Sequence, residues 1–383
     1  MADKKAAIGM VKQLLSVSAL CLLVACGNSS NPFMDDETDD GDPAGENGGE
    51  TDGDTGGPIE SDGRLPPGTT DPTPDTSIYR SEARVTDAND SNYGNGFAND
   101  IFYDGENDTF YVDGLAFDGT QPDGVAYSRA AGKLGSHAAY EAPTFVPDDV
   151  TGTPIRQFTH RAVYGVSPSG VSEFAVVRTG NYANYGFGGF IYQRNQLEDD
   201  PTADDLVLPP ERPEGQATYS GDYAGLRDFQ GRGGLELVRA QAEIDIDIGA
   251  FEGSCTGTNC EHAIRGYIFD REILDLNGND ISADYLAALN DDLPDGTPPA
   301  PEIPTITFRV GPGVMDENGE ATGGVDTVDP EGNELDTGNY YLLLSGDHTT
   351  GDGEIAGIVV IEGDDPRFDN VTVRETGGFI ATR

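Results

Sequence analysis

The sequence predicts an all-β protein, and three observations lead to this fold class. Segments at 243–248, 305–310 and 370–374 alternate apolar and polar residues, which is the pattern of half-buried strands. Gly, Asp and Asn separate such segments as turn formers, and glycine alone supplies 52 of the 383 residues. Only residues 282–289 have a helical pattern, with Ser282 as the expected cap. We therefore predict antiparallel strands that form a sandwich or a barrel.

Residues 1–25 are typical of an export signal. Lys4, Lys5 and Lys12 precede an apolar run at 14–25, which is shorter than the roughly 20 residues of a membrane-spanning helix. Translation from Met10 instead of Met1 would still give a complete signal. The first 25 residues have two possible interpretations. They form either a lipoprotein signal or an ordinary secretory signal that happens to be followed by a cysteine.

Leu-Val-Ala-Cys at 23–26 resembles the lipobox of bacterial lipoproteins. The resemblance implies that Cys26 carries acyl chains and becomes the first residue of the mature protein. Gly27 follows, where the usual inner-membrane retention signal is Asp, so the resemblance implies export to the outer membrane. Two or three acyl chains hold a protein stably on a bilayer. We expect a lipid-anchored protein and favour the cell surface over the periplasmic face.

An acidic segment follows the lipidation site at 26–78. Between Asp35 and Asp75, fourteen Asp or Glu residues face a single basic residue, Arg64, and almost nothing in this stretch could be buried. Such a composition cannot offset the entropy of ordering a chain. We predict a disordered tether that holds the folded body away from the membrane.

The charge of the whole chain limits its partners. Lys and Arg number 22 against 69 Asp and Glu, a formal net charge of −47. No basic stripe is present to neutralise phosphates, so nucleic acid is excluded as an expected partner. The same charge repels anionic lipid head groups, which leaves attachment to the lipid anchor. Solubility in a salty medium explains the charge more simply than an acidic binding surface does.

The folded body divides into two β-rich halves. We predict an N-terminal β-rich region at 79–196, a polar, Pro-rich linker at 197–214, and a C-terminal domain at 215–383. The continuous apolar run at 355–361 predicts a strand buried on both faces. Gly-Gly-Phe-Ile-x-x-Arg occurs at 188–194 and again at 377–383, at the end of each half. The halves are either related lobes or parts of one domain, with the echo a coincidence.

The C-terminal half resembles a known family. Segments at 217–225, 233–237, 244–251 and 264–268 follow one another in the order seen in the transferrin-binding protein B-like barrel domains of surface lipoproteins, and 353–357 and 375–379 are similar to late strands of that family. The resemblance covers 215–383 and implies an antiparallel, Gly-rich β-barrel. Glycines within its Tyr-x-Gly-x-Tyr run would let strands curl into such a barrel.

Members of that family usually bind host proteins through their loops, and related pockets bind haem. No motif that contacts transferrin is found in this sequence. The resemblance therefore implies a binding barrel and leaves the ligand unidentified.

The two remaining cysteines, Cys255 and Cys260, predict a disulfide in an exported protein. His262 is close enough in sequence to make a metal site with them an alternative, although three ligands on one loop lack a fourth.

A second weak candidate for a metal is a calcium-like loop, because oxygen ligands recur at alternate positions. It lacks the Gly at position six and the Glu at position twelve, so a solvated turn competes with it. Its candidate ligands are Asp275, Asn277, Asn279 and Asp280.

Catalytic motifs are scarce. The histidines stand alone in the sequence, without His-Glu-x-x-His, at His137, His160, His262 and His348. Asp336 lies in Leu-Asp-Thr-Gly, which resembles the triplet of aspartic proteases, but its polar flanks predict instead a turn that leads into a strand at Tyr340.

We therefore expect a non-enzymatic binding module without a cofactor, acting in nutrient, iron or haem acquisition on an unknown protein or small molecule. A structural or adhesive envelope lipoprotein is the alternative, and an aspartic-type hydrolase is third.

Overall fold

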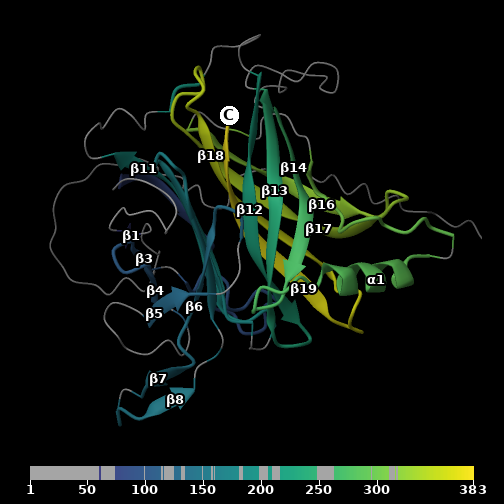
Figure 1. Cartoon of the computed structure of the whole chain (residues 1–383), viewed down its shortest axis with the longest axis horizontal. Helices are drawn as coiled ribbons and strands as arrows, with labels where there is room; N and C mark the ends of the chain where they lie inside the picture. Colours follow the sequence, from purple (N-terminus) through teal and green to yellow (C-terminus); the bar gives the residue numbers. More distant parts are fainter. Residues whose placement is uncertain are drawn as a thin grey trace, which may run out of the picture.

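The computed structural model describes residues 60–61, 74–98, 100–113, 115, 125–130, 134–148, 150–156, 158, 160–180, 184–197, 206–208, 216–247, 263–294, 296–309, 315 and 318–383. It confirms the all-β fold class: a closed eight-stranded barrel follows a curled nine-stranded sheet (Figure 1).

The barrel is antiparallel and closes where its first strand pairs with its last, as at Tyr223 and Phe379. Its strands are β12 (Gln216–Gln230), β13 (Leu235–Asp247), β14 (Ala263–Leu274), β15 (Ile306–Phe308), β16 (Glu320–Val328), β17 (Glu334–Ser345), β18 (Glu354–Asp364) and β19 (Thr372–Thr382). Side chains that alternate along each strand fill the interior, including Tyr223, Ile244, Tyr340 and Phe379. Of the four segments expected to be strands, 355–361 lies within β18, and 243–248, 305–310 and 370–374 overlap β13, β15 and β19.

The N-terminal sheet has the order β1-β3-β4-β5-β6-β9-β10-β11-β2. Its strands are β1 (Glu60–Ser61), β2 (Pro74–Ser81), β3 (Asp100–Asp104), β4 (Thr109–Asp113), β5 (Val125–Arg129), β6 (Ala138–Glu141), β9 (Arg161–Val166), β10 (Ser172–Arg178) and β11 (Gly188–Leu197). A separate hairpin, β7 (Phe145–Pro147) and β8 (Pro154–Arg156), projects from the body at the lower left of Figure 1.

The sheet packs against the outside of the barrel. Along β10, Ala175 and Val177 face the core of the sheet, whereas Phe174 and Val176 face the barrel. On the barrel side, a Cβ added at Gly378 would overlap the ring of Phe174. The shared interface core contains Leu134, Ala139, Val163, Phe174, Val176, Phe190, Tyr192, Ala224, Leu226, Leu237, Leu274, Leu343, Ala356, Ile358 and Ile380.

The first strands of the sheet lie closer to the N-terminus than the composition predicts. β1 and the start of β2 fall inside the segment 26–78 that we expected to be a disordered tether. The prediction is wrong for these residues because β1 pairs with β3 and β2 pairs with β11, and backbone pairing with a neighbouring strand does not require apolar side chains. For the predicted linker at 197–214, β11 runs to Leu197 and Val207 forms a bridge with Asp347.

The single helix expected from the sequence is present as α1 (Ser282–Asp292). Its expected cap is wrong: Ile281 occupies the cap position, and no side chain caps the helix. The hydroxyl of Ser282 instead accepts a hydrogen bond from the backbone N–H of Ile273 at 2.9 Å. Ser282 thus ties the helix to β14, a long-range contact that local pattern does not encode.

The repeated Gly-Gly-Phe-Ile motif has different roles in its two copies. In β11, Phe190 faces the barrel and Ile191 faces the core of the sheet. In β19 the orientation is reversed, because Phe379 fills the barrel interior and Ile380 faces the sheet. The phenylalanine of the first copy and the isoleucine of the second therefore lie in the interface between sheet and barrel.

Candidate functional site

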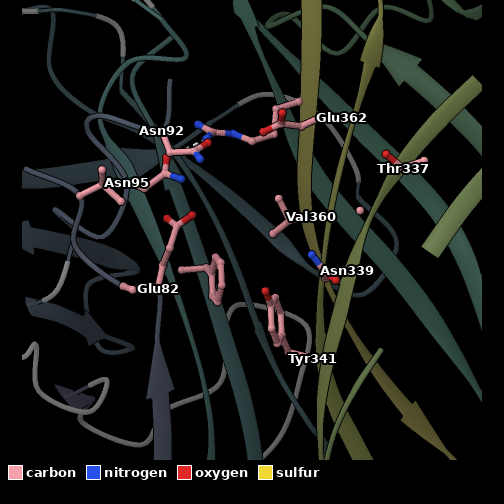
Figure 2. Close-up of a pocket in the computed structure, with 13 residues that line it drawn as sticks. Glu82, Asn92, Asn95, Thr337, Asn339, Tyr341, Val360 and Glu362 are labelled. Carbon is pink, nitrogen blue, oxygen red and sulfur yellow. Dashed lines mark hydrogen bonds between the residues drawn. The ribbon is translucent and has the colours of Figure 1, made fainter. Parts of the chain in front are cut away.

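A cleft of about 510 Å³ lies where the segment that follows β2 meets the outer face of β17 and β18 (Figure 2). This volume falls in the range of about 300–1,000 Å³ that is usual for small-molecule sites. The lining residues are Glu82, Ala83, Val85, Asn92, Asn95, Phe190, Thr337, Gly338, Asn339, Tyr341, Val360, Glu362 and Arg374.

Strand alternation builds the barrel side of the cleft. Tyr340 and Leu342 point into the barrel, so Thr337, Asn339 and Tyr341 lie on the outer face of β17. On β18, the residues opposite Asn339 and Thr337 are Val360 and Glu362. The two strands thus form one wall with amide, hydroxyl and carboxyl groups beside an aromatic ring.

The opposite wall is an irregular segment, 82–97, that is held by backbone hydrogen bonds. The N–H of Glu82 donates to the carbonyl of Phe190 at 2.9 Å, and the N–H of Val85 donates to the carbonyl of Asn95 at 3.0 Å. Gly94 has a φ of 101°, and a Cβ there would overlap the carbonyl oxygen of Gly186. Only glycine fits this close approach, which fixes Asn92 and Asn95 at the cleft.

Two aromatic rings form the apolar part of the cleft. Phe190 and Tyr341 stack with ring centroids 5.9 Å apart and planes inclined by 28°. Phe190 is buried, whereas Tyr341 is partly exposed to the cleft. Burial, together with the negative charge of Glu82, raises the pKa of Tyr341, so its hydroxyl stays protonated at neutral pH.

The arginines at the base of the cleft are already paired. Arg374 and Asp228 are both fully buried and form a 2.8 Å ion pair, and Arg374 also donates to Asn95 Oδ1 at 2.7 Å. Behind the cleft, Arg178 is paired with Glu82 at 3.1 Å. Burial acts to lower the pKa of Arg374, but Asp228 outweighs this effect and raises it. Neither guanidinium is left as an uncompensated positive charge for an anionic ligand.

Glu362 is the cleft carboxyl with the weakest compensation. It accepts a hydrogen bond from the hydroxyl of Tyr185 at 3.4 Å. Burial raises the pKa of Glu362, and the charge of Arg374 opposes that rise. The cleft therefore holds a carboxyl that accepts hydrogen bonds and gains a proton more easily than a free side chain does.

The residues that the sequence suggested as sites do not meet at this cleft. Cys26, Cys255, Cys260 and His262 lie outside the described residues, so lipidation and the disulfide stay predictions. The calcium-like loop connects β14 to α1. Both carboxylate oxygens of Asp275 accept hydrogen bonds within the loop. The backbone N–H groups of Asn277 and Asn279 donate to Oδ1, and the side-chain amide of Asn279 donates to Oδ2, each at 2.8 Å. Asp280 accepts one from the N–H of Ser282. Among the described residues, no group of three or more His, Cys, Asp or Glu side chains could hold a metal.

The predicted turn at Leu-Asp-Thr-Gly is wrong, because Asp336 lies within β17, paired with Gly363 of β18. Long-range pairing with β16 and β18 on both sides overrides the local turn preference. The Asp336 side chain points inward over Gly363 and accepts a 2.6 Å hydrogen bond from Thr327. Burial raises the pKa of Asp336, and that hydrogen bond opposes the rise. Thr337, its neighbour, points outward to the cleft.

The described histidines have structural partners. His137 bonds the carbonyl of Asp222 at 2.8 Å, and His160 bonds Tyr127 at 3.1 Å. His348 bonds Tyr219 at 2.5 Å. Burial lowers the pKa of His160 and of His348 to about 4, so both are neutral at physiological pH. None of the three lines the cleft.

Sequence reasoning missed most of the cleft. Polar residues at alternate positions of β17, Thr337 and Asn339, followed by Tyr341, were a usable signal for an exposed strand face. No local signal indicated that Asn92 and Asn95 would face them, because more than 200 residues separate the two walls.

No protein-family model matches the chain, and no curated protein is significantly similar to it. Within the described part of the chain, no helix combines the length and the apolar character needed to cross a membrane. The chain is thus defined by its fold and its cleft: a barrel-and-sheet protein with a polar, aromatic-lined cleft where its two parts meet.

Proposed function

We propose that this protein is a lipid-anchored, non-enzymatic binding module of the bacterial outer membrane that captures a ligand in the cleft. The cleft is the observation that carries this proposal. It combines a stacked aromatic pair with amide, hydroxyl and carboxyl groups at the junction of two rigid β-structures, the arrangement typical of small-molecule sites. The lipobox-like segment ending at Cys26 and the resemblance to surface-lipoprotein barrels support the location.

Nutrient capture is the role that we favour within this proposal, but haem is not the ligand that the cleft favours. Haem needs an axial ligand, commonly His, and anion-compensating groups for its propionates. His137, His160 and His348 are buried away from the cleft, and Arg374 is already paired with Asp228. A ligand without strong negative charge fits these surroundings better.

A binding panel on the full chain extracted in detergent tests capture. The panel contains neutral disaccharides, spermidine, citrate and haem, each titrated by ligand-observed NMR or absorbance. Saturable binding of any one compound that weakens in Tyr341→Ala supports capture in the cleft. If no compound of any class binds saturably, the proposed capture function is wrong.

Protease treatment of intact and permeabilised cells tests the location. We expect the acidic tether to be cut in intact cells, which would place the protein at the cell surface. In a Cys26→Ala variant the protein should leave the membrane fraction and lose incorporation of labelled palmitate. Survival in intact cells, with cleavage only after permeabilisation, would contradict a surface location.

Adhesion is a second candidate function, and the projecting hairpin favours it. Phe145, Val150 and Ile155 of this hairpin are 58%, 92% and 47% exposed, an unusual display of apolar side chains on an acidic protein. Adhesion predicts that Phe145→Ser combined with Ile155→Ser abolishes cell attachment. Tyr341→Ala should leave attachment unchanged. The reverse pattern would exclude adhesion through the hairpin.

A further inference from the structure

The groups that remain for a ligand in the cleft are mostly uncharged. In the described part of the chain, no hydrogen bond engages the side chains of Thr337 or Asn339, and both are exposed to the cleft. Asn92 lies on the opposite wall, at the end of the cleft where Glu362 lies (Figure 2). Side-chain amides and hydroxyls both donate and accept hydrogen bonds, so they match a ligand whose groups do the same.

Most of the charge in and behind the cleft is paired. Glu82 is neutralised by Arg178, and Arg374 is neutralised by Asp228. Glu362 lies near Arg374, and the positive charge of that guanidinium partly offsets the charge of the carboxylate. An anionic ligand would meet no uncompensated guanidinium, and a polycation would meet a single carboxyl, Glu362, whose charge Arg374 partly offsets.

The ring of Tyr341 supplies a flat apolar contact beside these polar groups. Its rear is supported by Phe190, which is 2% exposed, so the ring is held in place by the stack. The face of an aromatic ring carries partial negative charge, which attracts the partially positive C–H groups of an alicyclic ring. A ligand with hydroxyls at its edge and C–H groups on its face satisfies both parts of the cleft.

We infer that the cleft binds a neutral saccharide, with one sugar ring stacked on Tyr341 and the hydroxyls of the saccharide bonded by polar side chains that line the cleft, Asn339 among them. This inference rests on the proposed capture function and specifies its ligand class. Thr337 and Asn339 are exposed to solvent, so a longer oligosaccharide can extend along them past the stacked ring.

Saturation-transfer difference NMR with maltose, cellobiose, lactose and chitobiose tests the ligand class, and spermidine and citrate serve as charged controls. The protein is the full chain in detergent. We expect saturable binding of at least one of the neutral disaccharides, with weaker or no binding of the charged compounds.

Three variants locate the binding. Tyr341→Ala should weaken disaccharide binding about tenfold, and Tyr341→Phe should retain it, because the ring and not the hydroxyl makes the contact. Asn339→Leu keeps the volume of an exposed side chain but removes its donor and acceptor, and should also weaken binding about tenfold. Tyr267→Ala is the matched control, since Tyr267 is a partly exposed tyrosine on β14 that does not line the cleft.

The outcomes separate this inference from the proposed function. Disaccharide binding that is unchanged in both Tyr341→Ala and Asn339→Leu overturns the saccharide site. Binding of spermidine or citrate that depends on Tyr341, without any disaccharide binding, overturns the ligand class and leaves capture in the cleft intact. Failure of the whole panel overturns both.

Discussion

At the residue scale, buried charges inside one end of the barrel form a network in which each arginine lies beside at least one carboxylate. Glu375 accepts a 2.6 Å hydrogen bond from Arg271 and a 3.0 Å hydrogen bond from the hydroxyl of Tyr223. Arg271 and Glu375 are 6% and 3% exposed at their side chains. Removing one partner of such a pair leaves the other charge desolvated, which costs much more than the pair contributes.

Glu375→Gln should therefore lower the free energy of unfolding by about 3–5 kcal/mol, because it removes the carboxylate that is paired with the buried charge of Arg271. Urea denaturation followed by circular dichroism measures the change. The matched control is Glu334→Gln, whose carboxylate also lies 2.6 Å from an arginine, Arg309, but with side chains 55% and 51% exposed. That substitution should cost at most about 1 kcal/mol. Equal effects would contradict the buried-charge explanation.

Glu173 should make stability depend on pH. It lies in the core of the sheet, where Tyr164 and Asn195 donate hydrogen bonds to it. Burial raises the pKa of Glu173 from 4.5 to about 7, and those hydrogen bonds oppose the rise. Because folding favours the protonated form, its contribution to stability is full below about pH 4.5 and is lost as the pH rises to about 7.

Glu173→Gln removes this loss, because glutamine does not ionise. The unfolding free energy of the variant relative to wild type should increase by an amount on the order of 3 kcal/mol between pH 4.5 and pH 8. Denaturation at a series of pH values measures it. Parallel curves for the two proteins over this range would show that Glu173 does not carry the effect.

At the element scale, strand glycines make room for aromatic rings. Phe379 of β19 lies across Gly357 of β18, its cross-strand partner. Tyr223 of β12 covers Gly377 of β19 in the same way. The Gly-rich composition thus has a packing role in the barrel: rings fill the space above glycines, and the strands can curl.

Gly357→Ala should destabilise the barrel by about 1–3 kcal/mol, because the new methyl group overlaps the buried ring of Phe379. Thermal or urea unfolding measures the effect. Gly351→Ala is the control: a Cβ at Gly351 meets nothing within 4 Å, so the change should stay within about 0.5 kcal/mol. If Gly357→Ala left the free energy of unfolding unchanged, the ring of Phe379 would be able to shift without loss of packing, and the prediction would be wrong.

At the scale of the whole molecule, the barrel and the sheet share an interface core. Leu226, Ile358 and Ile380 on the outside of the barrel are buried only because the sheet covers them. A sheet that buries one apolar face against the barrel and another in its own core gives the two parts a common stability. The cleft lies at this junction, so its geometry depends on both.

Residues 215–383 expressed alone should therefore expose an apolar stripe, bind a hydrophobic dye and self-associate, whereas residues 74–383 should stay monomeric. Dye fluorescence and sedimentation measure both fragments. A monomeric, cooperatively folded 215–383 fragment without dye binding would contradict this prediction and support the barrel as an independent domain.

Much of the fold could be predicted from the sequence. Strands with a clear period of two, such as β13, were found, and α1 was placed to within a few residues at its end. The errors occurred where distant contacts outweigh local preference: Asp336 was assigned to a turn and lies in a strand, and Ser282 was assigned as a cap but bonds Ile273. The cleft was not predicted, because no local sequence pattern indicates that Asn92 and Asn339 line the same cleft.

The sequence alone determined the all-β class, the acidic character and the export-signal pattern, since strand periodicity, charge and short signals are local properties of the chain. Tertiary structure decided which face of β17 lines the barrel interior and which lines the cleft, which arginines are neutralised, and that burial raises the pKa of Glu173. These features depend on the surroundings that residues far apart in the chain create for each other, and a period of two says only that faces alternate, not what covers them.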